Sequence, residues 1–150
     1  MSTKQRGTRL IYHATVNTAW VDQAAGAAIP AGWTQVNNVI SVNPKPHEPE
    51  KFDDSDPEDV APEPVTYLKP GSVTFSKKKN SQTKTLRDLA AAQTKYTWAV
   101  LYIDGTAEYC ASGALICNSA GDANTGGFND KSPESYEIVP DAVLVAKAAA

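Results

Sequence analysis

The sequence predicts a mainly β fold: a β-sandwich or rolled barrel with one short flanking α-helix and a long loop rich in proline and acidic residues. Short runs of β-branched and aromatic residues alternate with glycine and proline breaks along most of the chain. Only residues 82–93 place apolar residues at helical spacing. Seven of the ten prolines lie within residues 44–70. The 150 residues fit a single domain, residues 1–150, with an extended arm at about residues 44–70.

Charge and hydropathy argue against two classes of protein. Fourteen basic and 17 acidic side chains give a net charge of −3, so nucleic-acid binding through a broadly basic surface is not expected. The sequence has no window of about 18 apolar residues, so a transmembrane helix is not expected. It also has no apolar stretch behind the N-terminus, so a secretory signal is not expected. We therefore expect the chain to fold in a cytosol, with Cys110 and Cys117 as free thiols.

The first third of the chain predicts two strands separated by a loop. Residues 8–16 are rich in β-formers and predict a strand, whereas residues 17–32 are small and predict a loop. Residues 33–43 alternate and predict one long strand. Its two faces would be an apolar one with Val36, Ile40 and Val42, and a mostly polar one with Gln35, Asn37 and Ser41.

The arm at residues 44–70 differs sharply in composition from the rest of the chain. Within residues 47–64, eight acids stand against one base, Lys51, so this stretch carries −7 and the other residues sum to +4. Its few apolar residues cannot build a core, and its prolines exclude a helix or a central strand. We expect an extended arm or a disordered loop that serves as an assembly contact, with a solvated linker as the alternative. Its acids are Glu48, Glu50, Asp53, Asp54, Asp56, Glu58, Asp59 and Glu63.

Regular structure is expected to resume after the arm. Residues 72–76 alternate and predict a strand. Residues 82–93 predict the helix, because Leu86, Leu89 and Ala90 form a stripe that can lie on a sheet. Between them lies a basic cluster, which is either a solvated strand end or a docking site for an acidic partner, since clusters of one sign favour complementary docking. The cluster is Lys77, Lys78 and Lys79.

A tight hairpin is expected next. Residues 96–103 are rich in β-formers and are followed by Asp104-Gly105, a pair typical of two-residue hairpin turns. A two-residue turn would place Val100 opposite Tyr109. Residues 118–133 predict a flexible loop, and a final strand is expected at about residues 135–146, around a proline.

No constellation in the sequence predicts catalysis. The chain lacks a phosphate-binding glycine motif with its lysine and a nucleophile elbow. His13 and His47 lie at no metal-ligand spacing from a cysteine or from each other. The acidic cluster of the arm lacks the glycine and glutamate spacing of a calcium-binding EF-hand loop. We expect no enzyme activity, no cofactor and no metal.

The order of these features resembles a known family. A strand, Val39-Ile40-Ser41-Val42-Asn43-Pro44, leads to Glu48 and then to Phe52-Asp53-Asp54-Ser55-Asp56, and Gly71-Ser72-Val73-Thr74-Phe75 follows as a returning strand. This arrangement resembles the major tail tube proteins of long, non-contractile-tailed bacteriophages. The resemblance covers roughly residues 8–145 and lies in the order of elements and in short, degenerate motifs. Family members often carry an extra C-terminal immunoglobulin-like domain, which is not expected here.

The resemblance implies a structural virion protein. Six copies would form a ring with a continuous inner sheet, and stacked rings would form a hollow tube through which DNA passes without tight binding. Implied partners are further copies of the chain and the tape-measure, tail-terminator and tail-tip proteins, without a membrane. The protein would be made and assembled in the bacterial host cytoplasm and located in the phage tail.

Residue roles follow from this resemblance combined with the charge pattern. The polar side chains Gln35, Asn37 and Ser41 would face the tube lumen, the acidic arm would reach the adjacent ring, and Lys77–Lys79 of a neighbour would receive it. Two other functions stay open: a tail terminator or head–tail connector that forms a ring but no tube, and a monomeric β-barrel module that binds a small ligand.

Overall fold

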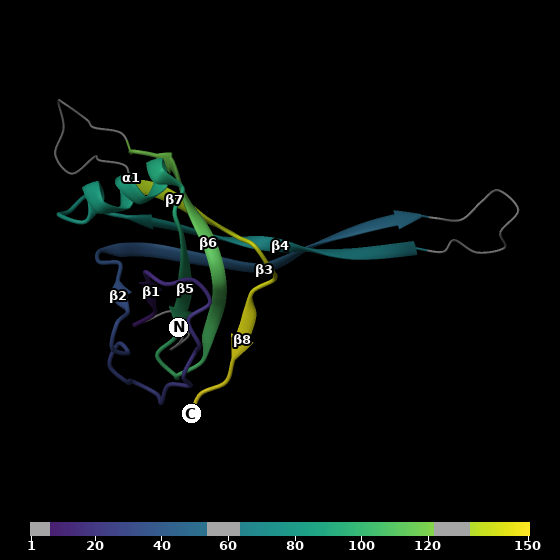
Figure 1. The fold of residues 1–150 in the computed structure, drawn as a ribbon, viewed down its shortest axis with the longest axis horizontal. Helices are drawn as coiled ribbons and strands as arrows, with labels where there is room; N and C mark the ends of the chain where they lie inside the picture. Colours follow the sequence, from purple (N-terminus) through teal and green to yellow (C-terminus); the bar gives the residue numbers. More distant parts are fainter. Residues whose placement is uncertain (1–6, 54–63, 122–132) are drawn as a thin grey trace, which may run out of the picture.

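The computed structural model describes residues 7–53, 64–121 and 133–150, and within these residues the chain is mainly β with a single helix (Figure 1). All eight described strands belong to one antiparallel sheet in the order β2-β1-β5-β6-β7-β4-β3, with β8 paired to β6. The elements in chain order are β1 (Arg9–His13), β2 (Thr34–Gln35), β3 (Val39–Asp53), β4 (Pro64–Lys77), α1 (Thr83–Ala92), β5 (Lys95–Leu101), β6 (Ala107–Ser119), β7 (Glu134–Pro140) and β8 (Val145–Lys147).

The sheet curls strongly but does not close. Strands β2 and β3 lie at opposite ends of the strand order, yet only residues 36–38 separate them along the chain. The sheet must therefore bend back until its two edges approach each other. The predicted mainly β class with one helix is confirmed, whereas the closed barrel or sandwich is not.

The concave face of the sheet holds the core. Trp98, Tyr136, Leu115 and Ile138 are almost fully buried there, and the Trp98 Nε1–H donates to the Gly113 carbonyl at 3.1 Å. Helix α1 packs on this core through Leu86, which is buried as the predicted stripe requires.

A loop covers part of the convex face. The Asn17 N–H donates to the Ala111 carbonyl, and the Gly26 N–H donates to the Ile103 carbonyl, so residues 14–33 lie across β1, β5 and the start of β6. Beneath this loop, four residues that alternate with the core residues of these strands are also buried: Ile11, Ala99, Leu101 and Ala107. This part of the sheet is covered on both faces, and we call it the covered half.

The predicted strand at residues 33–43 is wrong as a single element. It divides into β2 and the start of β3, and Asn38 adopts a left-handed backbone with φ of 58° between them. The pairing of β3 with β4 then shifts between Val39 and Ser41. This bulge interrupts the expected alternation, so that Ile40 is 54% exposed although Val36 is buried and Val42 packs against the core.

The predicted two-residue turn is also wrong. The Tyr102 N–H donates to the Thr106 carbonyl and the Gly105 N–H to the Tyr102 carbonyl, with Gly105 at φ of 91°, so three residues form the loop. Asp104 favours this geometry because its carboxylate accepts from both the N–H and the hydroxyl of Thr106. Val100 consequently pairs with Glu108 rather than with Tyr109.

Candidate functional site

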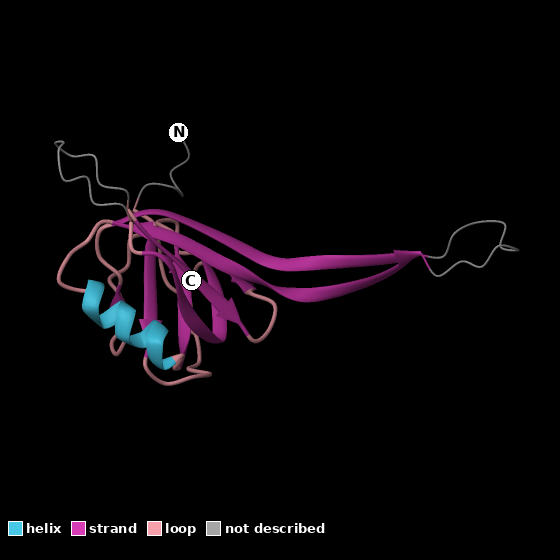
Figure 2. Cartoon of the chain, turned by 90° about the horizontal axis from the view of Figure 1, so that it is seen from above, coloured by secondary structure: helices cyan, strands magenta, loops and turns pink. Residues whose placement is uncertain are grey.

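The most unusual feature of the molecule is a two-stranded ribbon that projects from the body (Figures 1 and 2). Strands β3 and β4 keep one register from Ser41 opposite Ser76 to Asp53 opposite Pro64. Strand β7 pairs with β4 only at residues 73–77, so the outer part of the ribbon has no third strand within the described residues. The described part of the arm at residues 44–70 is thus a regular β-ribbon.

Two prolines of β3, Pro44 and Pro46, fit into this ribbon because they place their nitrogens on its outer edge. The Pro46 carbonyl accepts from the Leu144 N–H at 3.1 Å, so Pro46 directs its backbone away from β4. Residues two apart in a strand direct their backbone groups to the same side. Pro44 therefore also places its nitrogen on the free edge, where the missing N–H costs no bond of the β3–β4 ladder. Both prolines also block the attachment of a further strand at their positions.

The ribbon leaves the body at a close backbone approach. A Cβ atom on Gly71 would lie 1.8 Å from the Lys45 carbonyl oxygen and 2.9 Å from the His47 nitrogen. Because both neighbours are backbone atoms, a side chain at this position would force the two strands apart. The base of the ribbon therefore requires glycine at residue 71.

The convex face of the other part of the sheet carries polar, mostly small side chains and is not covered by the loop. We call this part, formed by β3, β4 and β7 near the body and by residues 113–119 of β6, the open half. The strand registers place its side chains in rows, and one row crosses all four strands as Ser41, Ser76, Ser135 and Ser119. The next row consists of Asn43, Thr74, Glu137 and Ile116. We call these two rows, with Lys45, Ser72, Val139, Ala114 and Lys95 beside them, the polar face.

Both lysines of the polar face lie next to carboxylates. The Lys45 Nζ is 3.0 Å from a Glu48 oxygen, and the Lys95 Nζ is 3.0 Å from an Asp141 oxygen. The Ser112 hydroxyl also donates to Asp141. Hydrogen bonds from Lys95 and Ser112 lower the pKa of Asp141, so this carboxylate stays ionised beside its lysine. Glu137 adds a further carboxyl group to the same face.

Two edges of the open half lack a neighbouring strand within the described residues. Strand β5 pairs with β6 only as far as Ala114, which leaves residues 115–119 of β6 without a partner on that side. Strand β3 is the last strand of the sheet at the opposite end. An exposed isoleucine stands at each edge, namely Ile40 on β3 and Ile116 on β6. Such edges are ready templates for pairing with another chain.

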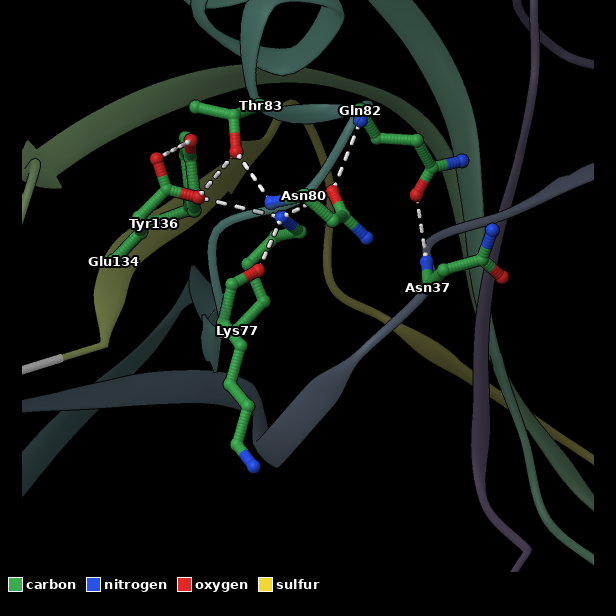
Figure 3. Close-up of polar contacts among 8 residues, drawn as sticks. Asn37, Lys77, Asn80, Gln82, Thr83, Glu134 and Tyr136 are labelled. Carbon is green, nitrogen blue, oxygen red and sulfur yellow. Dashed lines mark hydrogen bonds and ion pairs between the residues drawn. The ribbon is translucent and has the colours of Figure 1, made fainter. Parts of the chain in front are cut away.

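The predicted basic patch loses one of its three members. Lys77 is fully buried, and its Nζ donates to the Lys78 carbonyl at 2.8 Å, to Asn80 Oδ1 at 2.9 Å and to Glu134 Oε1 at 3.3 Å (Figure 3). Its side chain points toward the core on the concave face, because Lys77 lies on the same face of β4 as Val73 and Phe75. Lys77 is therefore a structural residue, and only Lys78 and Lys79 are exposed.

The three predicted lumen residues do not share one surface. Gln82, just before helix α1, accepts from the Asn37 N–H at 2.7 Å (Figure 3). It also donates to the Gln35 carbonyl at 2.9 Å. Gln35 and Asn37 therefore lie beside the helix start, and only Ser41 belongs to the polar face. The alternation at residues 72–76 and 135–139 could have identified the other members, since it places serine, threonine and glutamate opposite the core residues.

The acidic arm is described only in part. Glu48 lies on β3 beside Lys45, and Glu50 and Asp53 occupy backbone positions in the ribbon. Five of the predicted contact residues lie outside the described residues: Asp54, Asp56, Glu58, Asp59 and Glu63.

One pocket of about 480 Å³, which we call the seam pocket, lies between the residues just before β1 and the start of β3. Its walls are Gly7 and Thr8 before β1, residues 39–42 of β3, and Tyr102. Burial raises the pKa of the Tyr102 phenol, so the hydroxyl stays protonated at neutral pH. Across residues 7–53, 64–121 and 133–150, no three metal-ligating side chains gather at one place.

Two comparisons with known proteins identify no relative of this chain. A scan against models of protein families and a search of curated proteins find no match to this sequence. Of the residues that the structure describes, none form a helix long and apolar enough to span a bilayer.

Proposed function

We propose that this chain is the self-assembling subunit of a phage tail tube, in which stacked rings of six copies enclose a channel for DNA. The observation that carries the proposal is the open half of the sheet. Within the described residues, it combines a polar face that no loop covers with two strand edges that have no neighbouring strand. A chain that functions as a monomer usually protects such edges, whereas a ring subunit joins them.

The strand directions suit a ring. Neighbouring strands in the order β6-β7-β4-β3 are antiparallel, so β3 runs antiparallel to β6. The free edge of β3 in one copy can therefore continue the antiparallel ladder onto β6 of the next copy. Pro44 and Pro46 limit this pairing to the start of β3, around Val42. Repetition of one such head-to-tail contact closes a ring when its rotation fits.

The polar face is suited to the wall of a DNA channel. Binding of phosphates requires cations that are free to pair with them. On this face Lys45 and Lys95 each pair with a carboxylate, and Glu137 adds a negative charge. DNA would therefore move past the wall without being held. The ribbon projects beyond the body, and contact with the adjacent ring is the role that we assign to it.

The same proposal includes the partners of such a tube. These are further copies of the chain and the tape-measure, tail-terminator and tail-tip proteins, with assembly in the host cytoplasm and final location in the virion. A ring-forming connector or terminator is the nearest alternative. The seam pocket is the one observation that favours a ligand-binding module instead.

Cross-linking of the two edges tests the proposal directly. Cysteines introduced as Ile40→Cys and Ile116→Cys in one chain should give a ladder of disulfide-linked multimers after mild oxidation of concentrated protein. Negative-stain microscopy of the same sample should show hollow tubes. The matched control is Val21→Cys with Val145→Cys, two exposed valines outside the open half. A ladder no stronger than that of the control, with monomers in the microscope, would refute the assembly.

A further inference from the structure

The buried polar cluster at the end of β4 has a composition that structural support alone does not require. An ion pair in a protein interior pays a large desolvation cost, and an apolar pair of similar size is often at least as stable. Here Lys77 and Glu134 are both fully buried, and the Asn80 side chain lies against the same amine. An amine, a carboxamide and a carboxyl group thus meet within hydrogen-bond distance, shielded from water on the lysine side.

We propose that Lys77 and Asn80 join in an isopeptide bond that the folded chain forms by itself, with Glu134 as the proton carrier. Glu134 first takes a proton from the Lys77 ammonium at 3.3 Å, which leaves a neutral amine. The nitrogen lone pair then attacks Cγ of Asn80. The bond between Cγ and the amide nitrogen of Asn80 breaks as Glu134 returns its proton to that nitrogen, and ammonia leaves. Glu134 then takes the second proton of the attacking nitrogen, which becomes the nitrogen of a secondary amide.

The atoms of this step balance without a further reactant. One amine and one primary carboxamide give one secondary amide and one ammonia molecule. No oxidant, reductant or cofactor takes part. Ammonia can leave because Asn80 is only half-buried. The Lys77 amine is fully buried, so bulk water does not solvate its nitrogen.

The surrounding hydrogen bonds support each role. The Gln82 N–H donates to Asn80 Oδ1 at 2.9 Å, which polarises the carbonyl and stabilises the negative charge that develops on this oxygen during attack. The Thr83 hydroxyl donates to Glu134 Oε1 at 3.0 Å and accepts from the Asn80 N–H at 3.1 Å. Thr83 thereby ties the proton carrier to the asparagine (Figure 3). Tyr136 donates to Glu134 Oε2 at 3.2 Å and holds the carboxyl group from its other side.

The intact mass of the purified protein tests the bond. We expect a mass below that of the sequence by one ammonia molecule. A succinimide at Asn80-Ser81 would have the same mass, so digestion with trypsin separates the two products. An isopeptide bond from Lys77 to Asn80 holds the pieces together after cleavage at Lys78 or Lys79, whereas a succinimide lets them separate. An unmodified mass, or a lowered mass with separated peptides, would overturn the proposal.

Two variants identify the groups involved, and a third serves as the control. Asn80→Ala retains the ion pair of Lys77 with Glu134 and should restore the full mass. Glu134→Gln should also restore the full mass, and retention of the bond in this variant would refute the role of Glu134. Asn118→Ala is the matched control, because Asn118 also precedes a serine but is exposed and outside the cluster, so the lowered mass should persist. Circular dichroism confirms that each variant is folded.

Discussion

The covered half and the open half of the sheet have similar concave faces and very different convex faces. In the covered half, Ile11 and Leu101 are buried beneath the loop of residues 14–33, and that loop is tied to the strands by backbone hydrogen bonds. In the open half, serine, threonine and asparagine occupy the corresponding positions, and Ile116 and Val139 stand exposed among them. One half therefore stabilises the subunit alone, whereas the polar face of the other is the surface that we propose to meet another copy of the chain.

The largest expected effect separates the two halves by the same substitution. Ile11→Ala removes a fully buried side chain and should lower the free energy of unfolding by about 2–5 kcal/mol. Ile116→Ala removes a side chain that is 42% exposed, and its cost to the isolated subunit should stay below about 1 kcal/mol. Urea denaturation of both variants measures the difference. Equal losses would show that the open half is as well covered as the other.

A second prediction concerns the base of the ribbon. Gly71→Val places side-chain atoms against the Lys45 carbonyl and should cost about 1–3 kcal/mol, as overpacking does elsewhere. Hydrogen exchange should rise in the ribbon while the covered half stays protected. Gly26→Ala is the control, because no atom lies within 4 Å of the added Cβ and only its backbone φ of 71° is strained. Unchanged ribbon protection in Gly71→Val would contradict the close approach.

Much of this architecture could be predicted from local pattern. The apolar stripe at residues 82–93 predicts helix α1, which the structure confirms. The single final strand predicted at about residues 135–146 divides after Pro140 into β7 and β8, which pair with the same side of β6. The β-ribbon itself was not expected in regular form, because prolines count against a strand. The sequence could not show that Pro44 and Pro46 place their nitrogens on the free edge.

The candidate site was harder to predict because bulges changed the alternation. The shift between Val39 and Ser41 moves Ile40 to the surface, so residues 33–43 do not present one polar face. The composition of a charged run gave no sign that Lys77 would turn inward while Lys78 and Lys79 stay exposed. Its burial depends on Glu134, which lies 57 residues away in the sequence. A contact between residues so far apart in the sequence cannot be predicted from local sequence patterns.

The exposed part of the lysine cluster supplies a third prediction. Lys78→Gln with Lys79→Gln should slow tube formation if the acidic arm of a neighbour docks there, and added salt should slow the wild-type protein in the same way. The free energy of unfolding should change by less than about 0.5 kcal/mol, because both side chains are exposed. Light scattering during assembly and urea denaturation provide the two measurements. Assembly at the wild-type rate would exclude these lysines from the contact.

A further prediction tests the charge balance of the polar face. Asp141→Asn removes the carboxylate beside Lys95, and because the pair is half-exposed the loss should be at most about 1 kcal/mol. The pKa of Asp141 is lowered in the folded protein, so its contribution is present above the carboxyl's unfolded pKa and is lost as the pH falls through the folded value. The variant should therefore lose stability at neutral pH and match the wild type in acid.

The same variant should bind DNA more strongly than the wild type. Without Asp141, the Lys95 ammonium is released on the polar face and can pair with a phosphate. Fluorescence anisotropy with a labelled duplex at low salt should detect this gain, and rising salt should remove it. Asp88→Asn is the matched control, because it frees Lys84 from an equally short ion pair on helix α1, away from the polar face. If both variants bind DNA equally, any released lysine suffices, and the neutralised cations of the polar face have no particular role in the passage of DNA.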